Sequence, residues 1–182
     1  MSFSSTGLSD IFISALDSQG YDTPTPIQLE AIPAVLSGKD VMGIAKTGSG
    51  KTASFVLPIL QNLLKQSSAK HREPATLILV PTRELADQVL EVIRSFSENL
   101  PQRISSLAIY GGSSINTQMQ ALGKIDILVA TPGRLLDLVD KNALKLGSVS
   151  SLVLDEADKM LNLGFKEEVD KILSFLPSSR LN

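Results

Sequence analysis

The chain has 182 residues, enough for a single domain that buries a sizeable hydrophobic core. It has no cysteine, which excludes disulfides and thiolate metal sites and fits a protein of the reducing cytoplasm. The formal net charge is −2, so nucleic-acid binding would have to come from local groups and not from an overall basic surface. We see no signal peptide and no apolar run near the roughly 20 residues of a membrane helix, so no contact with a membrane is expected.

Two short helices are expected near the N-terminus. The first is amphipathic and ends at Gly20, and the second runs to about Leu36. Thr25 is the N-cap of the second helix, Pro26 is its first residue, and Gln28 lies three residues past the cap, which is the spacing of a capping box. Gln28 therefore has two open interpretations: it closes the end of the helix, or its amide reads the edge of an adenine base.

The next segment has the pattern of a phosphate-binding loop. Residues 41–45 form an apolar run that predicts a buried strand, residues 47–50 form a glycine-rich turn, and Lys51 and Thr52 open a helix over residues 53–64. Glycines let backbone N–H groups wrap around an anion, and the helix N-terminus adds positive charge. Lys51 is placed to reach the β- and γ-phosphates, and the Thr52 hydroxyl is placed to bind Mg²⁺. Ala45 stands where the usual pattern has glycine, and a small residue is thereby kept.

Strands and helices alternate through the rest of the chain. Apolar strands are expected at 75–80, 104–110, 125–130 and 151–154, each followed by a helix. This alternation predicts an α/β fold with a mostly parallel sheet and helices on both of its faces. In such a sheet every junction from a strand to a helix lies along the carboxyl edge, where ligands bind. The junctions at that edge are 47–52, 81–84, 111–113, 131–134 and 155–158.

Several of these junctions carry groups that bind anions. Thr82, Ser113 and Thr131 are expected N-caps, and each helix N-terminus is a ready anion site. Arg83 and Arg134 add a guanidinium within the first turn of their helices. The edge therefore predicts one nucleotide site and a row of further phosphate sites.

Two carboxylates end the last predicted strand. Asp155 at the strand tip is placed to hold Mg²⁺, and Glu156 is placed to polarise an attacking water. An acidic first turn that complements the dipole of the next helix is the alternative interpretation. The phosphate loop about a hundred residues earlier favours catalysis.

The sequence Asp155-Glu156-Ala157-Asp158 and the motifs around it resemble the DEAD-box RNA helicases over essentially the whole chain. The shared motifs occur in family order. Three regions are most similar to the bacterial RhlE-type branch: Gly111 to Met119, Ala130 to Asp137 and Lys159 to Phe165. Lys46, often Gln in the family, and Lys159, often Arg, are small departures that keep or add positive charge. The motifs that carry the resemblance are Phe3, Gly20 to Gln28, Ala45 to Thr52, Pro81 to Ala86, Gly111-Gly112 and Thr131 to Arg134.

The resemblance implies a RecA-like P-loop NTPase domain that binds ATP or ADP with Mg²⁺. Gln28 would read adenine as well as cap its helix, Tyr21 would stack on the base with support from Phe3, and Asp158 would link the nucleotide site to RNA sensing. The implied nucleotide-binding residues of the loop are Ala45, Lys46, Thr47, Gly48, Ser49, Gly50, Lys51 and Thr52. The implied contacts to the RNA backbone come from Pro81, Thr82, Arg83, Gly111, Gly112, Thr131, Pro132, Gly133 and Arg134.

The resemblance also implies how the chain is organised. Residues 1–182 would be the first RecA-like domain of a cytoplasmic, monomeric bacterial helicase, with a Q-motif region at 1–28 and an incomplete C-terminal end. A strand ending in Ser-Ala-Thr and a second RecA-like domain are absent from the chain, so its ATPase activity alone is expected to be negligible. The leading hypothesis is an RNA-dependent ATPase that unwinds short duplexes. An ATP-gated RNA clamp and a nucleotide-dependent DNA motor are the alternatives.

Overall fold

The computed structural model describes residues 2–46, 48–65 and 73–182. The chain divides into two compact units, and each is described by itself. The first, called here the N-terminal unit, comprises residues 1–69, 92–104 and 181–182. The second, called the sheet unit, comprises residues 70–91 and 105–180.

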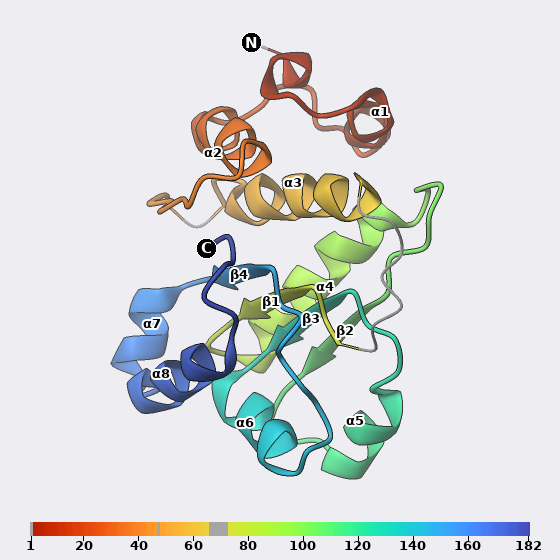
Figure 1. Cartoon of the computed structure of the whole chain (residues 1–182). Coiled ribbons are helices and arrows are strands. Elements are labelled where there is room, and N and C mark those ends of the chain that lie inside the picture. Colours follow the sequence, from red (N-terminus) through yellow and green to blue (C-terminus); the bar gives the residue numbers. More distant parts are fainter. Residues whose placement is uncertain (1, 47, 66–72) are drawn as a thin grey trace. The chain divides into compact units, whose positions relative to one another are not determined.

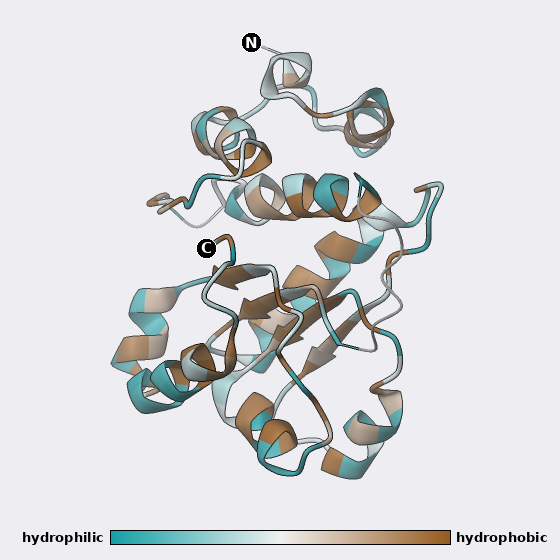
Figure 2. Ribbon diagram, in the orientation of Figure 1, coloured by the Kyte–Doolittle hydropathy of each residue, from teal (hydrophilic) through white to brown (hydrophobic). Residues whose placement is uncertain are grey.

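The sheet unit contains four parallel strands in the order β2-β3-β1-β4 (Figure 1). All four strands expected from the sequence, at 75–80, 104–110, 125–130 and 151–154, are confirmed. Each observed strand is four residues long. Most of their residues are apolar, so the strands are largely brown in Figure 2. The two central strands, β1 and β3, are buried along their whole length, as expected where helices cover both faces of a parallel sheet. The bounds are Thr76–Leu79 for β1, Ser106–Ile109 for β2, Ile127–Ala130 for β3 and Ser151–Leu154 for β4.

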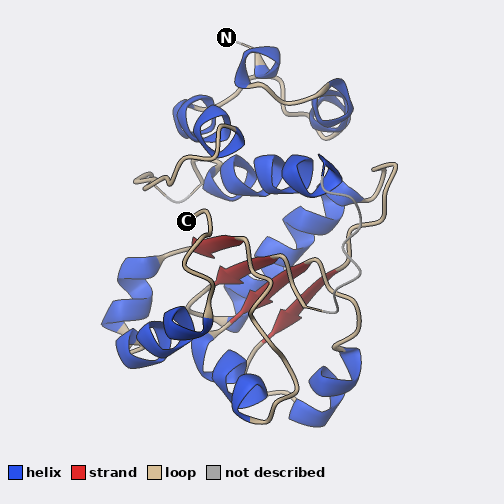
Figure 3. Ribbon diagram, in the orientation of Figure 1, coloured by secondary structure: helices blue, strands red, loops and turns tan. Residues whose placement is uncertain are grey.

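A helix follows each of these strands (Figure 3). The alternate strand side chains Leu77, Leu128 and Leu152 pack in one hydrophobic cluster with Leu135 of α6 and Ile172 of α8, so these two helices cover one face of the sheet. The helices that begin in this unit are α4 (Arg83–Ser97), α5 (Ile115–Ala121), α6 (Pro132–Asp140), α7 (Ala157–Asn162) and α8 (Lys166–Phe175).

The register of the strands aligns their carboxyl ends. Leu79 at the end of β1 pairs with Ala130 at the end of β3 and with Leu154 at the end of β4. Ile109 at the end of β2 pairs with the same Ala130. The four following junctions therefore start at one level along one edge, as predicted for ligand-binding loops in a parallel sheet.

The N-terminal unit is helical and is tied together by buried side chains. It contains the 3₁₀ helix η1 (Phe3–Thr6), α1 (Asp10–Ser18), α2 (Pro26–Leu36) and α3 (Lys51–Lys65). Gln61 of α3 is buried, accepts a hydrogen bond from Ser9 N at 2.7 Å and donates one to Gly7 O at 3.0 Å. This amide fixes the segment before α1 to α3, because a buried Gln without partners would destabilise the fold.

Residues 41–45 do not form the predicted buried strand. The side chains of Met42 and Ile44 are 89% and 90% exposed, and none of the described strands pairs with this segment. At the start of the segment, Val41 N donates a backbone hydrogen bond to Asn182 O at 3.0 Å. A strand is stable only when neighbouring strands accept and donate its backbone hydrogen bonds, so the apolar pattern alone was insufficient here. No helix in the described part of the chain has the length and hydrophobicity to cross a bilayer.

Candidate functional site

The phosphate loop connects residues 41–45 to α3 in the N-terminal unit. Gly48 and Gly50 have φ angles of +80° and +84°, which residues other than glycine rarely adopt. Ser49 N donates to Lys46 O at 3.2 Å, which closes a tight turn. The Ser49 hydroxyl is buried and has no hydrogen-bond partner, so the loop offers an unsatisfied polar atom to a ligand. The expected ligand residue Thr47 lies outside the described residues.

Gln28 links α2 to the phosphate loop. Its side chain is 1% exposed, its Oε1 accepts from Thr25 N at 2.9 Å, and its Nε2 donates to Gly50 O at 3.2 Å. The capping interpretation is therefore confirmed for the bond that Gln28 makes to Thr25. A Cβ on Gly50 would lie 2.5 Å from Gln28 Nε2, so the side chain also explains why glycine is needed at this position.

The two aromatic residues expected near adenine lie in the packed part of the N-terminal unit. Phe3 is buried within η1. Tyr21 is half-buried, and its ring packs against Phe96 with a centroid distance of 5.6 Å and an interplanar angle of 58°. This tilted arrangement is a common stabilising geometry for aromatic pairs.

The acidic junction after β4 has an unusual backbone. Glu156 has φ 51° and ψ 47°, in the left-handed region, and it precedes the first residue of α7. Such a conformation costs a non-glycine residue roughly 1 kcal/mol or more. Asp155 Oδ1 accepts a hydrogen bond from Glu156 N at 3.0 Å, which holds the turn. Glu156 Oε2 forms an ion pair with Lys159 Nζ at 3.3 Å, and Asp158 is exposed.

The junction after β1 presents an arginine at the surface. Thr82 Oγ1 accepts from Leu85 N at 3.3 Å, so its predicted role as N-cap of α4 is confirmed. The Arg83 side chain is 55% exposed, and its guanidinium carbon lies 4.9 Å from the centre of the Tyr110 ring. Arg83 Nε is 3.9 Å from Asp87 Oδ2. The pKa of Tyr110 is raised above its ordinary value, first by burial and then by the hydrogen bond to Asp87 and the charge of Asp87.

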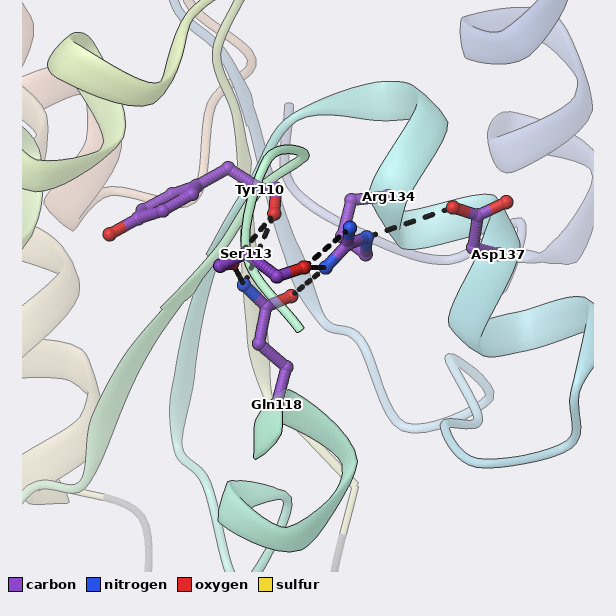
Figure 4. A network of polar contacts seen from close by, with 5 residues as sticks. All are labelled: Tyr110, Ser113, Gln118, Arg134 and Asp137. Atoms are coloured by element: carbon purple, nitrogen blue, oxygen red, sulfur yellow. Dashed lines mark hydrogen bonds and ion pairs between the residues drawn. The ribbon is translucent and has the colours of Figure 1, made fainter. Parts of the chain in front are cut away.

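Arg134, at the junction after β3, joins several residues of the same sheet edge through hydrogen bonds and an ion pair (Figure 4). Its two terminal nitrogens donate to Ser113 O at 3.1 and 3.0 Å, and Nη1 also donates to Gln118 Oε1 at 2.9 Å. Its Nε lies 3.7 Å from Asp137 Oδ2, and the side chain is 10% exposed. The planar guanidinium suits this forked contact, which a lysine could not reproduce. The residue therefore ties α6 to the loop after β2.

Ser113 is not the N-cap of α5, in contrast to the prediction. Ser114 takes that position and accepts from Thr117 N at 3.5 Å. The Ser113 hydroxyl instead donates to Tyr110 O at 3.3 Å and accepts from Gln118 Nε2 at 2.6 Å. The reason is that a residue already engaged in the turn after β2 cannot also cap the following helix.

The remaining residues expected to contact RNA lie in the same three junctions as Arg83, Ser113 and Arg134. Gly111 and Gly112 are exposed, and Gly112 has a φ of +85°. Thr131 is at the predicted N-cap position of α6, but its side chain makes no capping hydrogen bond. Pro81 and Pro132 are buried, and Gly133 is half-buried with no atom within 4 Å of where a Cβ would lie.

The structure brings together the junctions 81–83, 111–113, 131–134 and 155–158 in the sheet unit. Residues that sequence reasoning missed are Asp87, Tyr110, Gln118 and the pairing of Lys159. A signal existed for Gln118, because it shares a helix face with Ile115 and Leu122 and is polar among apolar positions. No sequence signal identified Tyr110 as the partner of Arg83.

The fold and the phosphate loop define the class of the molecule as an α/β nucleotide-binding domain of the RecA-like type. A family model described as DEAD/DEAH box helicase matches residues 25–181. The chain therefore belongs to the DEAD/DEAH box helicase family. The solved structure of a DEAD box protein from the hyperthermophile Methanococcus jannaschii is similar as well, with a TM-score of 0.89 and 39% sequence identity. The match covers 100% of this chain and 48% of that one.

Curated relatives are similar over nearly the whole chain. An ATP-dependent RNA helicase DeaD of Buchnera aphidicola is 48% identical over 97% of this chain, and the protein of the same name from Escherichia coli K12 is 47% identical over 96%. A DEAD-box ATP-dependent RNA helicase CshA of Bacillus cereus is 44% identical over 97%. The chain spans 29%, 27% and 33% of the lengths of these three relatives.

Proposed function

We propose that the chain is the ATP-binding, N-terminal RecA-like domain of an ATP-dependent RNA helicase of the DEAD-box type. The observation that carries the proposal is the strand register, which aligns the carboxylate junction after β4 with three junctions rich in phosphate-binding groups. One edge thereby combines groups for hydrolysis with groups for a polyanionic backbone. The names of the relatives support the same activity.

The nucleotide is proposed to bind at the phosphate loop. Lys51 and Thr52 at the start of α3 are suited to the phosphates and to Mg²⁺, and the buried, unpartnered Ser49 hydroxyl is a further donor. Gln28, with Tyr21 and Phe3, is proposed to recognise adenine. Mg²⁺ is proposed to be held by nucleotide phosphates, water and one carboxylate, Asp155.

Hydrolysis is assigned to Glu156. Water attacks the γ-phosphorus, the bond to the bridging oxygen breaks, and Glu156 polarises the water and takes up its proton. Bound Mg²⁺ would supply neutralising charge for the phosphates. Lys159 holds the Glu156 carboxylate at 3.3 Å, and Asp158 is proposed to connect this junction to RNA binding.

RNA is proposed to bind along the other three junctions through its sugar-phosphate backbone. Such contacts carry no base information, so binding is expected to be independent of sequence. Exposed Arg83 is suited to contact a phosphate. Arg134 is also proposed to contact the backbone, and its largely buried side chain holds the neighbouring loop as well. The remaining proposed contacts are Pro81, Thr82, Gly111, Gly112, Thr131, Pro132 and Gly133.

The whole protein is proposed to be a cytoplasmic monomer in which residues 1–182 belong to the first RecA-like domain and a second RecA-like domain completes the active site. By this proposal the chain alone binds nucleotide weakly and turns it over negligibly. A closer relation to the RhlE-type branch also stays a proposal. It rests on the regions Gly111 to Met119, Ala130 to Asp137 and Lys159 to Phe165, while the relatives reported above carry the names DeaD and CshA.

The test is Glu156→Gln in the intact protein. RNA-stimulated phosphate release is expected to fall by about two orders of magnitude or more, since a general base contributes about 10²–10⁴ in rate. Binding of a non-hydrolysable ATP analogue should persist. Glu167→Gln in the exposed first turn of α8 is the matched control and should leave turnover unchanged. Undiminished turnover in the Glu156 variant would refute the assignment.

The same variant separates the alternatives. Strand separation that continues without turnover would favour an ATP-gated RNA clamp, in which hydrolysis serves only release. Competition of RNA against DNA for stimulation of the intact protein addresses the third hypothesis, and a preference for DNA would reject the RNA assignment.

A further inference from the structure

Tyr110 lies at the point where the three proposed RNA-binding junctions meet. It follows the last residue of β2 and directly precedes Gly111-Gly112. Its ring lies under the Arg83 guanidinium at 4.9 Å, and its carbonyl accepts from Gln118 Nε2 at 3.1 Å. Figure 4 shows the ring and the carbonyl pointing to opposite sides of the backbone, so the two contacts do not compete.

The carbonyl side of Tyr110 is connected to Arg134. Gln118 is buried, donates to Tyr110 O and to Ser113 Oγ, and accepts from Arg134 Nη1 at 2.9 Å. Arg134 in turn donates twice to Ser113 O. Because every polar atom of the Gln118 amide has a partner, the backbone of Tyr110 is held in one position relative to α6.

The ring side of Tyr110 restrains an exposed cation. Arg83 is on the first turn of α4, and its side chain would otherwise sample many rotamers in water. The ring and the Asp87 carboxylate, 3.9 Å from Nε, together hold the guanidinium near the surface. Asp87 is itself exposed, so an incoming phosphate can replace it as the anion beside Arg83 while the ring contact remains.

We propose that Tyr110 is a positioning residue for RNA binding: its ring presets the Arg83 guanidinium for a backbone phosphate, and its carbonyl couples that arginine to the 111–113 loop and to Arg134. This inference deepens the proposed function and rests on the RNA contact assigned there to Arg83. Holding the cation in place lowers the ordering cost of binding, so the ring contributes affinity without contacting RNA.

The experiment measures binding of a fluorescent ten-nucleotide oligouridylate to the intact protein with a non-hydrolysable ATP analogue. Tyr110→Leu removes the ring and is expected to weaken binding about two- to fivefold, the range of an exposed cation–π contact. Tyr110→Phe keeps the ring and should rescue most of this loss. Tyr110→Val, suited to the end of a strand, is a second ring-less variant whose result stands if Tyr110→Leu folds poorly.

A double-mutant cycle with Arg83→Ala distinguishes positioning from a general structural effect. If Tyr110 acts through Arg83, replacing Tyr110 by Leu in the Arg83→Ala background causes no further loss of affinity. The slope of log K against log salt should also fall by about 0.7 for Arg83→Ala, the value for one lost contact to a single strand. Circular dichroism and binding of the ATP analogue check that each variant is folded.

The outcomes separate this inference from the proposed function. Independent, additive losses from the two residues, or an equal loss in Tyr110→Phe and Tyr110→Leu, would overturn the positioning role alone. An Arg83→Ala variant that binds the oligouridylate as tightly as the unchanged protein would reject the RNA contact itself, and the positioning role with it.

Discussion

The loop after β2 and the phosphate loop are both glycine-containing connections before a helix, yet they are stabilised in different ways. The strand before residues 111–113 is paired in the sheet, and Arg134 and Gln118 hold the loop with side-chain hydrogen bonds. The segment before the phosphate loop has no strand partner among the described residues, and Met42 and Ile44 face solvent. A glycine pattern therefore identifies a loop. Whether the segment before that loop forms a strand depends on the strands that pair with it.

The largest effect on the free energy of unfolding is expected from a substitution within a paired strand. Leu128→Ala removes a fully buried side chain from β3 and should lower the free energy of unfolding by about 2–5 kcal/mol. Ile44→Ala is the matched change in the unpaired segment and should alter it by less than about 0.5 kcal/mol. Denaturant unfolding followed by circular dichroism measures both. Similar losses would show that residues 41–45 are packed as a strand.

The next effect concerns the loop at residues 111–113, which Arg134 holds in place. Arg134→Ala removes three hydrogen bonds of a mostly buried guanidinium and leaves Ser113 O and Gln118 Oε1 without these donors, which should cost about 2–3 kcal/mol of unfolding free energy. Thermal unfolding measures it, with Arg103→Ala at an exposed position as the control. A loss no larger than that of the control would mean that the network does not hold the loop.

The smallest expected effect on stability concerns the phosphate loop. Gly50→Ala places a methyl group 2.5 Å from Gln28 Nε2 at a φ of +84°, and should cost about 1–2 kcal/mol while weakening ATP binding. Gly48→Ala has the same sign of φ but open space around its Cβ, so it isolates the backbone strain. Equal losses in the two variants would mean that contact with Gln28 contributes nothing. Thermal unfolding and titration with a fluorescent nucleotide provide the data.

Much of the fold follows from local patterns. Four apolar runs between turn residues predicted β1 to β4, and alternation with helices predicted their parallel arrangement. The capping role of Gln28 also followed from spacing alone. The strand at 41–45 was predicted wrongly, because pairing is a non-local property that a short apolar run cannot reveal.

The site was predicted as a set of positions but not as a set of contacts. The carboxyl-edge rule placed Arg83 and Arg134 on the same edge, yet it gave both the same role. Their different environments, one on the Tyr110 ring and one inside a hydrogen-bond network, depend on side chains from other elements. The choice of Ser114 over Ser113 as N-cap was likewise decided by the bonds that Ser113 makes elsewhere.

The left-handed backbone of Glu156 has a consequence for protein engineering. Glycine and asparagine adopt this conformation more readily than glutamate, so the folding energy alone would favour either of them at position 156. The chain instead carries a carboxylate there and pairs it with Lys159. Selecting variants for thermal stability would therefore tend to remove the group to which ATP hydrolysis is assigned, so stability and turnover make opposing demands on this one residue.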